Sequence, residues 1–300
     1  MDLDRRQTDA LLAVIETGSF EKAASHLHVT QSAVSQRVRA LESRLGGPLV
    51  VRSRPCRPTP QGQRLLRFLR RAALLEQELA AEWAPPGANT PHAISLAINA
   101  DTLGTWFLPA VAPLLMEQNL LLDVTVDDQD HTFALLEAGA AVGCVSTESR
   151  PMRGCVAESL GAMRYRMVAT PAFVARWFGA GFTREPARHA PVMVFNRKDA
   201  LQADFLMQRF GLAADAYPSH YVPSNEAYFV ALRASLGYGL VPELQCGEAL
   251  ARGEVVDLAP DSPVDVALYW HAWKVQSPRL EALTASIVDA ARGALARRLP

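Results

Sequence analysis

Amide, hydroxyl and guanidinium side chains gather on one side of a short predicted helix: Gln31, Ser32, Ser35, Gln36 and Arg39. Thr30 stands directly before them and is a good N-cap. Amides and hydroxyls near the start of a helix can bond the edges of DNA bases, and an arginine can read guanine or grip a phosphate. The pattern therefore favours Thr30, Gln31, Ser32, Ser35, Gln36 and Arg39 as a set of residues that contacts the major groove.

Two further helices are predicted beside this one, over residues 4–17 and about 20–27. Gly18 ends the first of them and Ser19 caps the second, and a tight turn joins the second to the helix over residues 31–45. On the helix over residues 31–45, apolar side chains recur at helical spacing opposite the polar ones. Three short helices of this kind predict a helix-turn-helix domain over residues 1–60.

Basic residues are concentrated in the last helix of the helix-turn-helix and in the segment that follows it. Between positions 37 and 71 there are ten arginines (Arg37, Arg39, Arg44, Arg52, Arg54, Arg57, Arg64, Arg67, Arg70, Arg71) and one acid, Glu42, although the net charge of the chain is −1. Residues 48–59 predict a short two-stranded wing in which Arg52 and Arg54 are candidates for contact with DNA. A solvated helix face is the alternative interpretation, but a nearly acid-free run favours a nucleic-acid surface.

A long helix is predicted from residue 61 to residue 82, within a linker segment over residues 61–83. Apolar residues follow one another along it at steps of three and four: Leu65, Phe68, Ala72, Leu75 and Leu79. This spacing is that of a dimerisation seam, and a dimer would supply two readers of a repeated DNA site. The alternative is that the stripe packs on its own domain. Arg67, on the same helix, is a candidate for a phosphate contact.

Residues 84–91 are rich in proline and predict a hinge before an effector domain over residues 92–300. In that domain strand-like runs alternate with helical ones, which indicates an α/β fold. Predicted strands cover residues 94–98, 121–126, 142–145, 167–169, 192–195, 220–222 and 264–270, with a short run at 239–242. Predicted helices cover residues 107–118, 132–138, 200–210, 226–236 and 278–299.

Composition narrows the classes of protein further. No apolar run reaches the roughly 18 residues of a membrane span, and the first residues predict a helix rather than a signal peptide, so we expect a cytoplasmic protein without a membrane partner. The four cysteines are scattered, which favours free thiols and no metal site, with a redox pair as the alternative. The seven histidines show no ligand spacing, and no catalytic motif occurs, so we expect no enzyme.

Several ordered motifs resemble those of the LysR-type transcriptional regulators. They are Phe20-Glu21-Lys22-Ala23-Ala24, Thr30-Gln31-Ser32-Ala33-Val34-Ser35, Leu41-Glu42, Leu49-Val50-Val51-Arg52 and Thr59-Pro60-Gln61-Gly62. Residues 95–103, 161–165, 222–227 and 267–271 look like the branch that responds to lysine and arginine, called the ArgP or LysG branch and described in older usage as an inhibitor of chromosome initiation.

The resemblance implies a fold and a set of partners. The fold class would be α plus α/β: a winged helix-turn-helix, a linker helix and a two-lobed effector domain like a periplasmic binding protein. Lobe 1 would take about residues 92–163 and 268–300, and lobe 2 about residues 164–267. The partners would be a promoter with an inverted repeat, RNA polymerase, a lysine or arginine effector and further copies of the chain in a homodimer or homotetramer. No cofactor is implied. The regulated genes would serve amino-acid export or biosynthesis.

In open α/β sheets ligands bind beyond the carboxyl ends of strands. Polar loops follow several predicted strands here, and they also contain Asn196 and Asn225. A basic amino acid needs acids for its cations and hydroxyls or amides for its carboxylate. The candidates are therefore Thr102, Ser146 and Ser224 for the carboxylate, Asp101, Asp127, Asp128 and Glu226 for the cations, and Asn99 beside them. Caps and solvated turns are the alternative roles for these residues.

Two other functions stay open at this point. The chain could be a regulator of the same type with a different small-molecule effector. It could also be an architectural DNA-binding protein that responds to no ligand, although such a protein would not need an effector domain of this size with clustered carboxylates.

Overall fold

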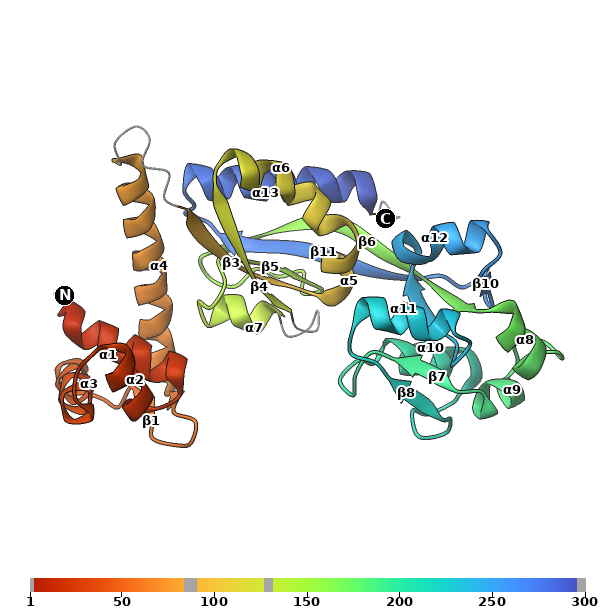
Figure 1. Cartoon of the computed structure of the whole chain (residues 1–300), viewed down its shortest axis with the longest axis horizontal. Helices are drawn as coiled ribbons and strands as arrows, with labels where there is room; N and C mark the ends of the chain where they lie inside the picture. The colour runs from red at the N-terminus through yellow and green to blue at the C-terminus, as the bar shows by residue number, and fades with distance from the viewer. Residues whose placement is uncertain (1–2, 84–90, 127–131, 296–300) are drawn as a thin grey trace. The chain divides into compact units, whose positions relative to one another are not determined.

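The computed structural model describes residues 3–83, 91–126 and 132–295. It divides into two compact units: the first comprises residues 1–88 with 137–141, and the second residues 89–136 with 142–300. Figure 1 shows their elements, and each unit is described below by itself. None of the helices in these described ranges has the length and apolar character needed to cross a membrane.

The first unit begins with the predicted helices α1 (Arg5–Thr17), α2 (Phe20–His26) and α3 (Gln31–Leu45). Asp4, Ser19 and Thr30 each accept a hydrogen bond from a backbone N–H at the start of the following helix. Gly18 ends α1 with φ 68° and Gly46 ends α3 with φ 74°. Both angles lie in the left-handed region, which glycine adopts without a steric cost. The helix-turn-helix prediction is confirmed.

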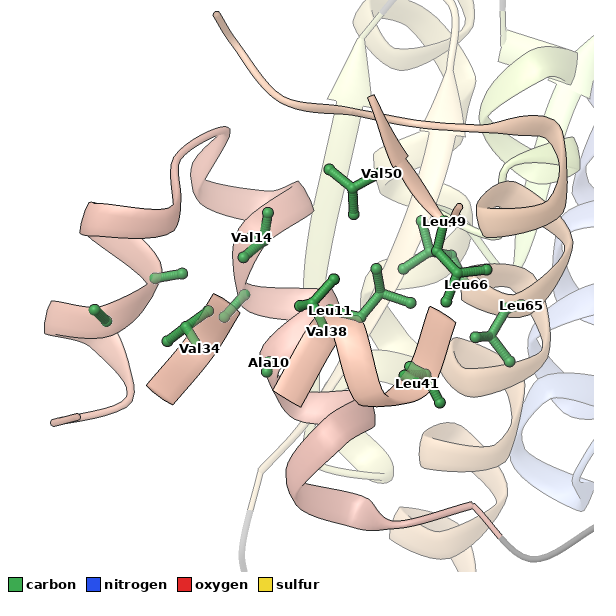
Figure 2. Close-up of a cluster of buried hydrophobic side chains, with 13 residues drawn as sticks. Ala10, Leu11, Val14, Val34, Val38, Leu41, Leu49, Val50, Leu65 and Leu66 are labelled. Atoms are coloured by element: carbon green, nitrogen blue, oxygen red, sulfur yellow. The ribbon is translucent and has the colours of Figure 1, made fainter. Parts of the chain in front are cut away.

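A wing and a long helix complete this unit. Strands β1 (Val50–Val51) and β2 (Arg57–Pro58) pair antiparallel, as predicted, and α4 follows over Pro60–Glu82. Gly62 lies so close to the carbonyl of Leu49 that a Cβ atom would collide with it, so the start of α4 can pack directly on the wing. Figure 2 shows the resulting core, in which Leu65 and Leu66 of α4 join the residues of α1 and α3.

The predicted dimerisation seam needs a correction at its first position. Leu65 is only 9% exposed and belongs to the core of its own unit, because the first turns of α4 pack against the helix-turn-helix. Further along, Phe68 and Leu75 are 58% and 48% exposed, and Ala72 is half-buried. The side chain of Leu79 lies outside what the structure describes. An apolar stripe thus remains available on α4, but it begins at Phe68.

The second unit is built on a seven-stranded sheet with the order β10-β6-β11-β5-β3-β4, and β9 also pairs with β6. Its strands are β3 (His92–Ile98), β4 (Leu120–Val126), β5 (Gly143–Ser146), β6 (Cys155–Ala169), β9 (Gly239–Pro242), β10 (Val256–Asp257) and β11 (Val264–Trp273). β3 pairs in parallel with β4 and β5, whereas β6 and β11 pair antiparallel along most of their length.

Strands β6 and β11 connect two parts of this unit, as Figure 1 shows. One end of the pair continues through β5 into β3 and β4, which we call lobe 1. The other end carries β9 and β10, and lobe 2 also contains the parallel pair β7 (Val192–Val194) and β8 (Ser219–Tyr221). The β6–β11 register shifts between Leu268 and Tyr269, close to the predicted lobe boundary at residues 267 and 268.

Helices cover both lobes. Lobe 1 contains α5 (Ala100–Thr102), the π-helix η1 (Leu103–Phe107), α6 (Leu108–Glu117), α7 (Thr132–Glu137) and α13 (Pro278–Ala294). Lobe 2 contains α8 (Pro171–Trp177), α9 (Arg184–His189), α10 (Leu201–Phe210), α11 (Asn225–Arg233) and α12 (Glu243–Ala251). The mixture of strands and helices confirms the α/β prediction for this part of the chain.

The sequence interpretation missed several elements. The predicted strand over residues 167–169 is only the end of β6, because charged residues such as Glu158, Arg164 and Arg166 hide the strand pattern of the remainder. Helix α8 was also missed, although Thr170 caps it and Pro171 opens it. Helices α9 and α12 are short, and their sequences have no strong apolar period.

Candidate functional site

The first candidate site is the exposed face of α3 in the first unit. Gln31, Ser32, Gln36 and Arg39 are exposed and Ser35 is half-buried. Thr30 caps the helix: its Oγ1 accepts a hydrogen bond from the backbone N–H of Ala33 at 3.2 Å and lies 2.9 Å from the Ser32 hydroxyl. The structure therefore brings all six predicted residues onto one face of α3, on which only Ser35 is partly covered.

The opposite face of α3 fixes this surface in place. Val34, Val38 and Leu41 are 0% exposed and pack with Ala23 of α2, whose small side chain lets the helices approach closely. Such burial stabilises each large apolar side chain by about 1.5–3 kcal/mol. The polar face of α3 is thus rigidly supported by an apolar one, as direct reading of base edges requires.

Glu42 has a structural role in the arginine-rich region. Its Oε1 accepts hydrogen bonds from the backbone N–H groups of Leu49 at 2.9 Å and Val50 at 3.3 Å. The single acid of this stretch therefore ties the wing to α3. One carboxylate is too few to offset the positive charge of the ten arginines in the same stretch.

The three predicted DNA-contacting arginines outside α3 differ in their surroundings. Arg52 and Arg54 of the wing are exposed, and the Arg52 guanidinium lies 4.8 Å from the centre of the Phe20 ring. That cation–π contact holds Arg52 beside the start of α2. Arg67 is half-buried, and its Nε atom is buried without a hydrogen-bond partner among the described residues. Arg54 is therefore better placed than Arg67 to meet a phosphate.

The second candidate site is a cavity of about 270 Å³ in the second unit, lined by residues from both lobes. Lobe 1 contributes Asn99, Ala100, Asp101 and Thr147, and the connecting strands contribute Tyr165 and Val266. Most of the remaining lining comes from lobe 2: Phe195, Lys198, Asp199, Ala200, Leu201, Gln202, Asp204, Asn225, Tyr228, Leu240, Pro242 and Gln245. Three carboxylates and one ammonium group line the cavity, which therefore favours a cationic occupant.

Asp101 is the most constrained of these carboxylates. Its Oδ2 accepts a hydrogen bond from the Tyr165 hydroxyl and its Oδ1 accepts one from the Asn225 amide, both at 2.6 Å. Burial raises the pKa of the Asp101 carboxyl, while these two hydrogen bonds act in the opposite direction. Two neutral donors thus support a carboxylate at the cavity wall, and a cation from the ligand would stabilise its charged form further.

The floor of the cavity is held by a second set of hydrogen bonds. The Gln202 amide donates to the Tyr228 hydroxyl at 3.2 Å and accepts from the backbone N–H of Leu240 at 2.9 Å. Tyr228 donates in turn to the carbonyl of Met193 at 3.0 Å. Burial raises the pKa of Tyr228 well above its ordinary value, and the nearby Asp199 and Asp101 add to this shift. Tyr228 is therefore a neutral hydrogen-bonding group between two acids.

The predicted effector residues are only partly brought together. Asn99 and Asp101 line the cavity, and Asn99 also caps α5. Thr102 and Ser146 do not line it: they are 0% and 1% exposed, and the Ser146 hydroxyl accepts a hydrogen bond from the backbone of Glu148. We had expected both at the ligand, but the tight packing at the ends of β3 and β5 encloses them.

Two other predicted residues, Ser224 and Glu226, do not line the cavity. Ser224 and Glu226 are exposed, and Ser224 caps α11 through the N–H of Ala227, so these two are corrected from cavity residues to helix-start residues. Asp127 and Asp128 lie outside the described residues. Within the described ranges no cluster of three or more potential ligands could hold a metal ion.

Several cavity residues were missed from the sequence. Tyr165 lies on β6, whose pattern was not recognised, and Gln245 lies on α12, which was not predicted. Asp199 follows Asn196, whose side chain accepts two backbone hydrogen bonds from Lys198 and Asp199 and so bends the loop toward α10. That Asn–x–x–Asp turn before a predicted helix was the one local signal available.

Comparison with known proteins gives matches along almost the whole chain. Residues 5–63 match the family described as bacterial regulatory helix-turn-helix protein, lysR family, and residues 93–292 match the LysR substrate binding domain. The HTH-type transcriptional regulator ArgP of Aeromonas salmonicida is 42% identical over 293 residues, which cover 98% of each chain.

Two solved structures are also similar. The crystal structure of ArgP from Mycobacterium tuberculosis is 43% identical, with a TM-score of 0.86, and the match covers 99% of this chain and 100% of the other. Full-length LysG from Corynebacterium glutamicum with bound effector Arg is 36% identical, with a TM-score of 0.79, and the match covers 98% and 99% of the two chains.

Proposed function

The chain belongs to the LysR family of bacterial transcriptional regulators, and we propose that it senses lysine or arginine and controls genes for amino-acid export or biosynthesis. It is a DNA-binding regulator and not an enzyme, since both of its domains match domains of such regulators. The relatives named ArgP and LysG belong to the same branch that the sequence motifs resemble.

On the DNA, α3 enters the major groove of each half of an inverted repeat. Gln31, Ser32, Ser35, Gln36 and Arg39 contact base edges or nearby phosphates, and the wing arginines lie along the backbone or in the minor groove. Phe68, Ala72 and Leu75 of α4 contribute to an interface between two copies of the chain, which then form a homodimer or homotetramer. The exposed apolar side chains on α4 support this role.

The effector enters the acid-lined cavity between the two lobes. The single observation that carries this proposal is the Asp101 carboxylate, which two neutral donors, the Tyr165 hydroxyl and the Asn225 amide, hold at the cavity wall. An ammonium or guanidinium group of the ligand would compensate its charge. The relative from Corynebacterium glutamicum, whose structure contains a bound Arg effector, supports the choice of a basic amino acid.

The effector domain works as a two-lobed module of the periplasmic-binding-protein type. A ligand that binds one arrangement of the lobes more tightly than another shifts the population toward it, and this alters DNA binding or contact with RNA polymerase. The protein does this in the bacterial cytosol, where both the promoter and the amino-acid pool are present.

Isothermal titration tests the proposal. L-arginine and L-lysine should bind the full-length chain, whereas L-citrulline and L-norleucine, which lack the side-chain cation, should bind at least about tenfold more weakly. A fluorescence assay with a promoter fragment from a neighbouring exporter or biosynthetic gene should then detect a change in affinity when arginine or lysine is added. Equal binding of the charged and neutral amino acids would contradict basic amino-acid sensing, and no binding of any metabolite would favour the architectural alternative.

A further inference from the structure

A chain of hydrogen bonds extends from Asp101 into lobe 2. The Asn225 side chain donates to Asp101 through Nδ2 at 2.6 Å and accepts from Gln245 Nε2 through Oδ1 at 2.7 Å. Gln245 Nε2 also approaches the backbone carbonyl of Asn225 at 3.3 Å. Asp101 lies on α5 of lobe 1, whereas Asn225 opens α11 and Gln245 lies on α12 of lobe 2, all labelled in Figure 1.

Gln245 sets the donor-to-acceptor order of these hydrogen bonds, which runs from Gln245 through Asn225 to Asp101. The Asn225 amide has one end that donates and one that accepts, and only the donating end can face the Asp101 carboxylate favourably. Because Gln245 donates to the oxygen of Asn225, it holds the nitrogen toward Asp101. Without that donor the amide could turn, and its oxygen would then face the carboxylate and repel it.

Close packing supports the same orientation from the lobe 1 side. A Cβ atom added at Gly104 would lie 2.8 Å from Asn225 Oδ1, so η1 approaches the amide more closely than a larger residue would allow. Asn225 is thus held between Gly104 and Gln245. The carboxylate that faces the cavity is joined through Asn225 to lobe 2, and through Tyr165 to the strand that connects the lobes.

We propose that Gln245 is a positioning residue that acts through Asn225: it holds Asp101 in place for the cationic group of the ligand and makes lobe 2 respond when that group binds. This inference rests on the proposed function, because it takes the cavity as the site of a basic amino acid. A ligand cation that pairs with the Asp101 carboxylate alters the hydrogen bond between Asp101 and Asn225. Because Asn225 and Gln245 lie on α11 and α12, this change acts directly on those two helices.

The experiment compares Gln245→Met and Gly104→Ala with the full-length native chain. The methionine has a similar volume but donates no hydrogen bond, and the alanine displaces the Asn225 amide. Both should weaken arginine binding by about tenfold in titration calorimetry. Gly247→Ala is the matched control, since this α12 glycine has open space around its Cβ position, and it should bind arginine as the native chain does.

A double-mutant cycle separates positioning from simple damage to the fold. If Gln245 acts through Asp101, Gln245→Met should lower arginine affinity by less than about twofold when Asp101 is already replaced by Asn. Ligand-observed NMR measures this affinity, because it detects weak binding. Where the Asp101→Asn chain binds too weakly to measure, the pH dependence decides. Loss of the Asn225 donor should move the midpoint of arginine binding to higher pH in Gln245→Met, because the charged carboxylate loses support.

The response of lobe 2 has its own readout. At saturating arginine, the factor by which the ligand changes operator affinity should fall toward one in Gln245→Met. Three results would overturn the inference while leaving the proposed function intact. They are native arginine affinity in Gln245→Met, an equal loss of arginine affinity with Asp101 and with Asp101→Asn, and an unchanged operator response. Failure of the native chain to bind arginine or lysine would instead refute the proposed function itself.

Discussion

The surface of α3 and the effector cavity are built in different ways. The first consists of neighbouring residues between positions 30 and 39 on one helix, exposed on one side and supported by an apolar core on the other. The second collects residues from positions 99 to 266, and its polar groups are already bonded to one another across two lobes. A contiguous surface leaves each side chain to act separately, whereas an assembled cavity makes its residues depend on their partners.

This difference affects how substitutions should combine. Exposed residues on α3 share few partners, so their effects on DNA binding should be nearly additive. Asp101, Tyr165 and Asn225 share one carboxylate, so their effects on ligand binding should not add. The predictions below test that contrast, beginning with the largest expected effect.

Leu41→Ala should separate the two regions most strongly. Leu41 is 0% exposed in the core of the first unit, and such a truncation costs about 3 kcal/mol. Operator binding should collapse while arginine affinity stays within about twofold, because the effector unit has its own core. Urea unfolding, anisotropy with operator DNA and calorimetry measure the three effects. Leu283→Ala, in the 0% exposed core of the other unit, should reverse the pattern; loss of both activities in each variant would contradict two separate units.

Asp101→Asn should weaken arginine binding by about 100-fold, since an amide cannot compensate a cation as a carboxylate does. Operator binding without ligand should change little. In the native chain arginine affinity should fall as the pH is lowered, because burial raises the Asp101 pKa and protonation removes the charge that the ligand needs. Asp261→Asn, at an exposed acid outside the cavity lining, is the control. Calorimetry at several pH values would refute this role of Asp101 if both variants behaved alike.

The same contrast explains how much the sequence could predict. The helix-turn-helix was predicted with its caps because Ser19, Thr30 and Gly46 act on their own helices, within a few residues. The alternation of strands and helices also identified the effector fold. Of the cavity, the sequence indicated Asn99 and Asp101, which follow a clear strand, and the loop that contains Asn225. Tyr165, Asp199 and Gln245 reach it through strand pairing and lobe packing, which no local pattern encodes.

Gln36→Ala should reduce discrimination between the operator and random DNA by about 1–3 kcal/mol if the amide bonds a base edge. The loss should depend on sequence, because phosphate contacts stay in place. Gln63→Ala is the matched control, an exposed glutamine on α4 rather than α3. Competition binding with operator and scrambled duplexes gives the affinity of each variant for the two DNA sequences. Equal losses on the two duplexes would mean that Gln36 does not read bases.

Arg54→Ala and Arg67→Ala should have smaller and unequal effects on DNA binding. Arg54 is exposed, so its loss should make the plot of log affinity against log salt less steep by about 0.9 if it meets one phosphate. Arg67, whose Nε is buried, should change that slope less. Anisotropy titrations over a range of salt concentrations measure the slopes. If Arg67→Ala changed the slope by about 0.9 and Arg54→Ala did not, Arg67 rather than Arg54 would be the phosphate contact.

The smallest predicted effect concerns His271, a buried residue of the effector unit with no counterpart in the DNA-binding surface. Its Nε2 lies 2.6 Å from the carbonyl oxygen of Glu148, while Nδ1 is buried without a hydrogen-bond partner among the described residues. Burial lowers the pKa of His271 below 6.5, opposed in part by the Glu148 carbonyl and carboxylate. The His271 imidazole therefore binds a proton more readily in the unfolded chain than in the folded one. The stability that His271 contributes above its unfolded pKa is lost as the pH falls through its folded pKa.

Urea unfolding of the full chain at about pH 7.5 and about pH 5.5 would measure this loss. In His271→Gln, which cannot titrate, the drop in the free energy of unfolding between the two pH values should be smaller than in the native chain. His220→Gln, at an exposed histidine, should keep the native drop. The comparison within one pair of pH values removes the contribution of Asp101, which has the opposite sign because its folded pKa is raised. If His271→Gln kept the full native drop, the acid sensitivity of the effector unit would have to arise from other groups, and the buried imidazole would be only a packing element against Phe133.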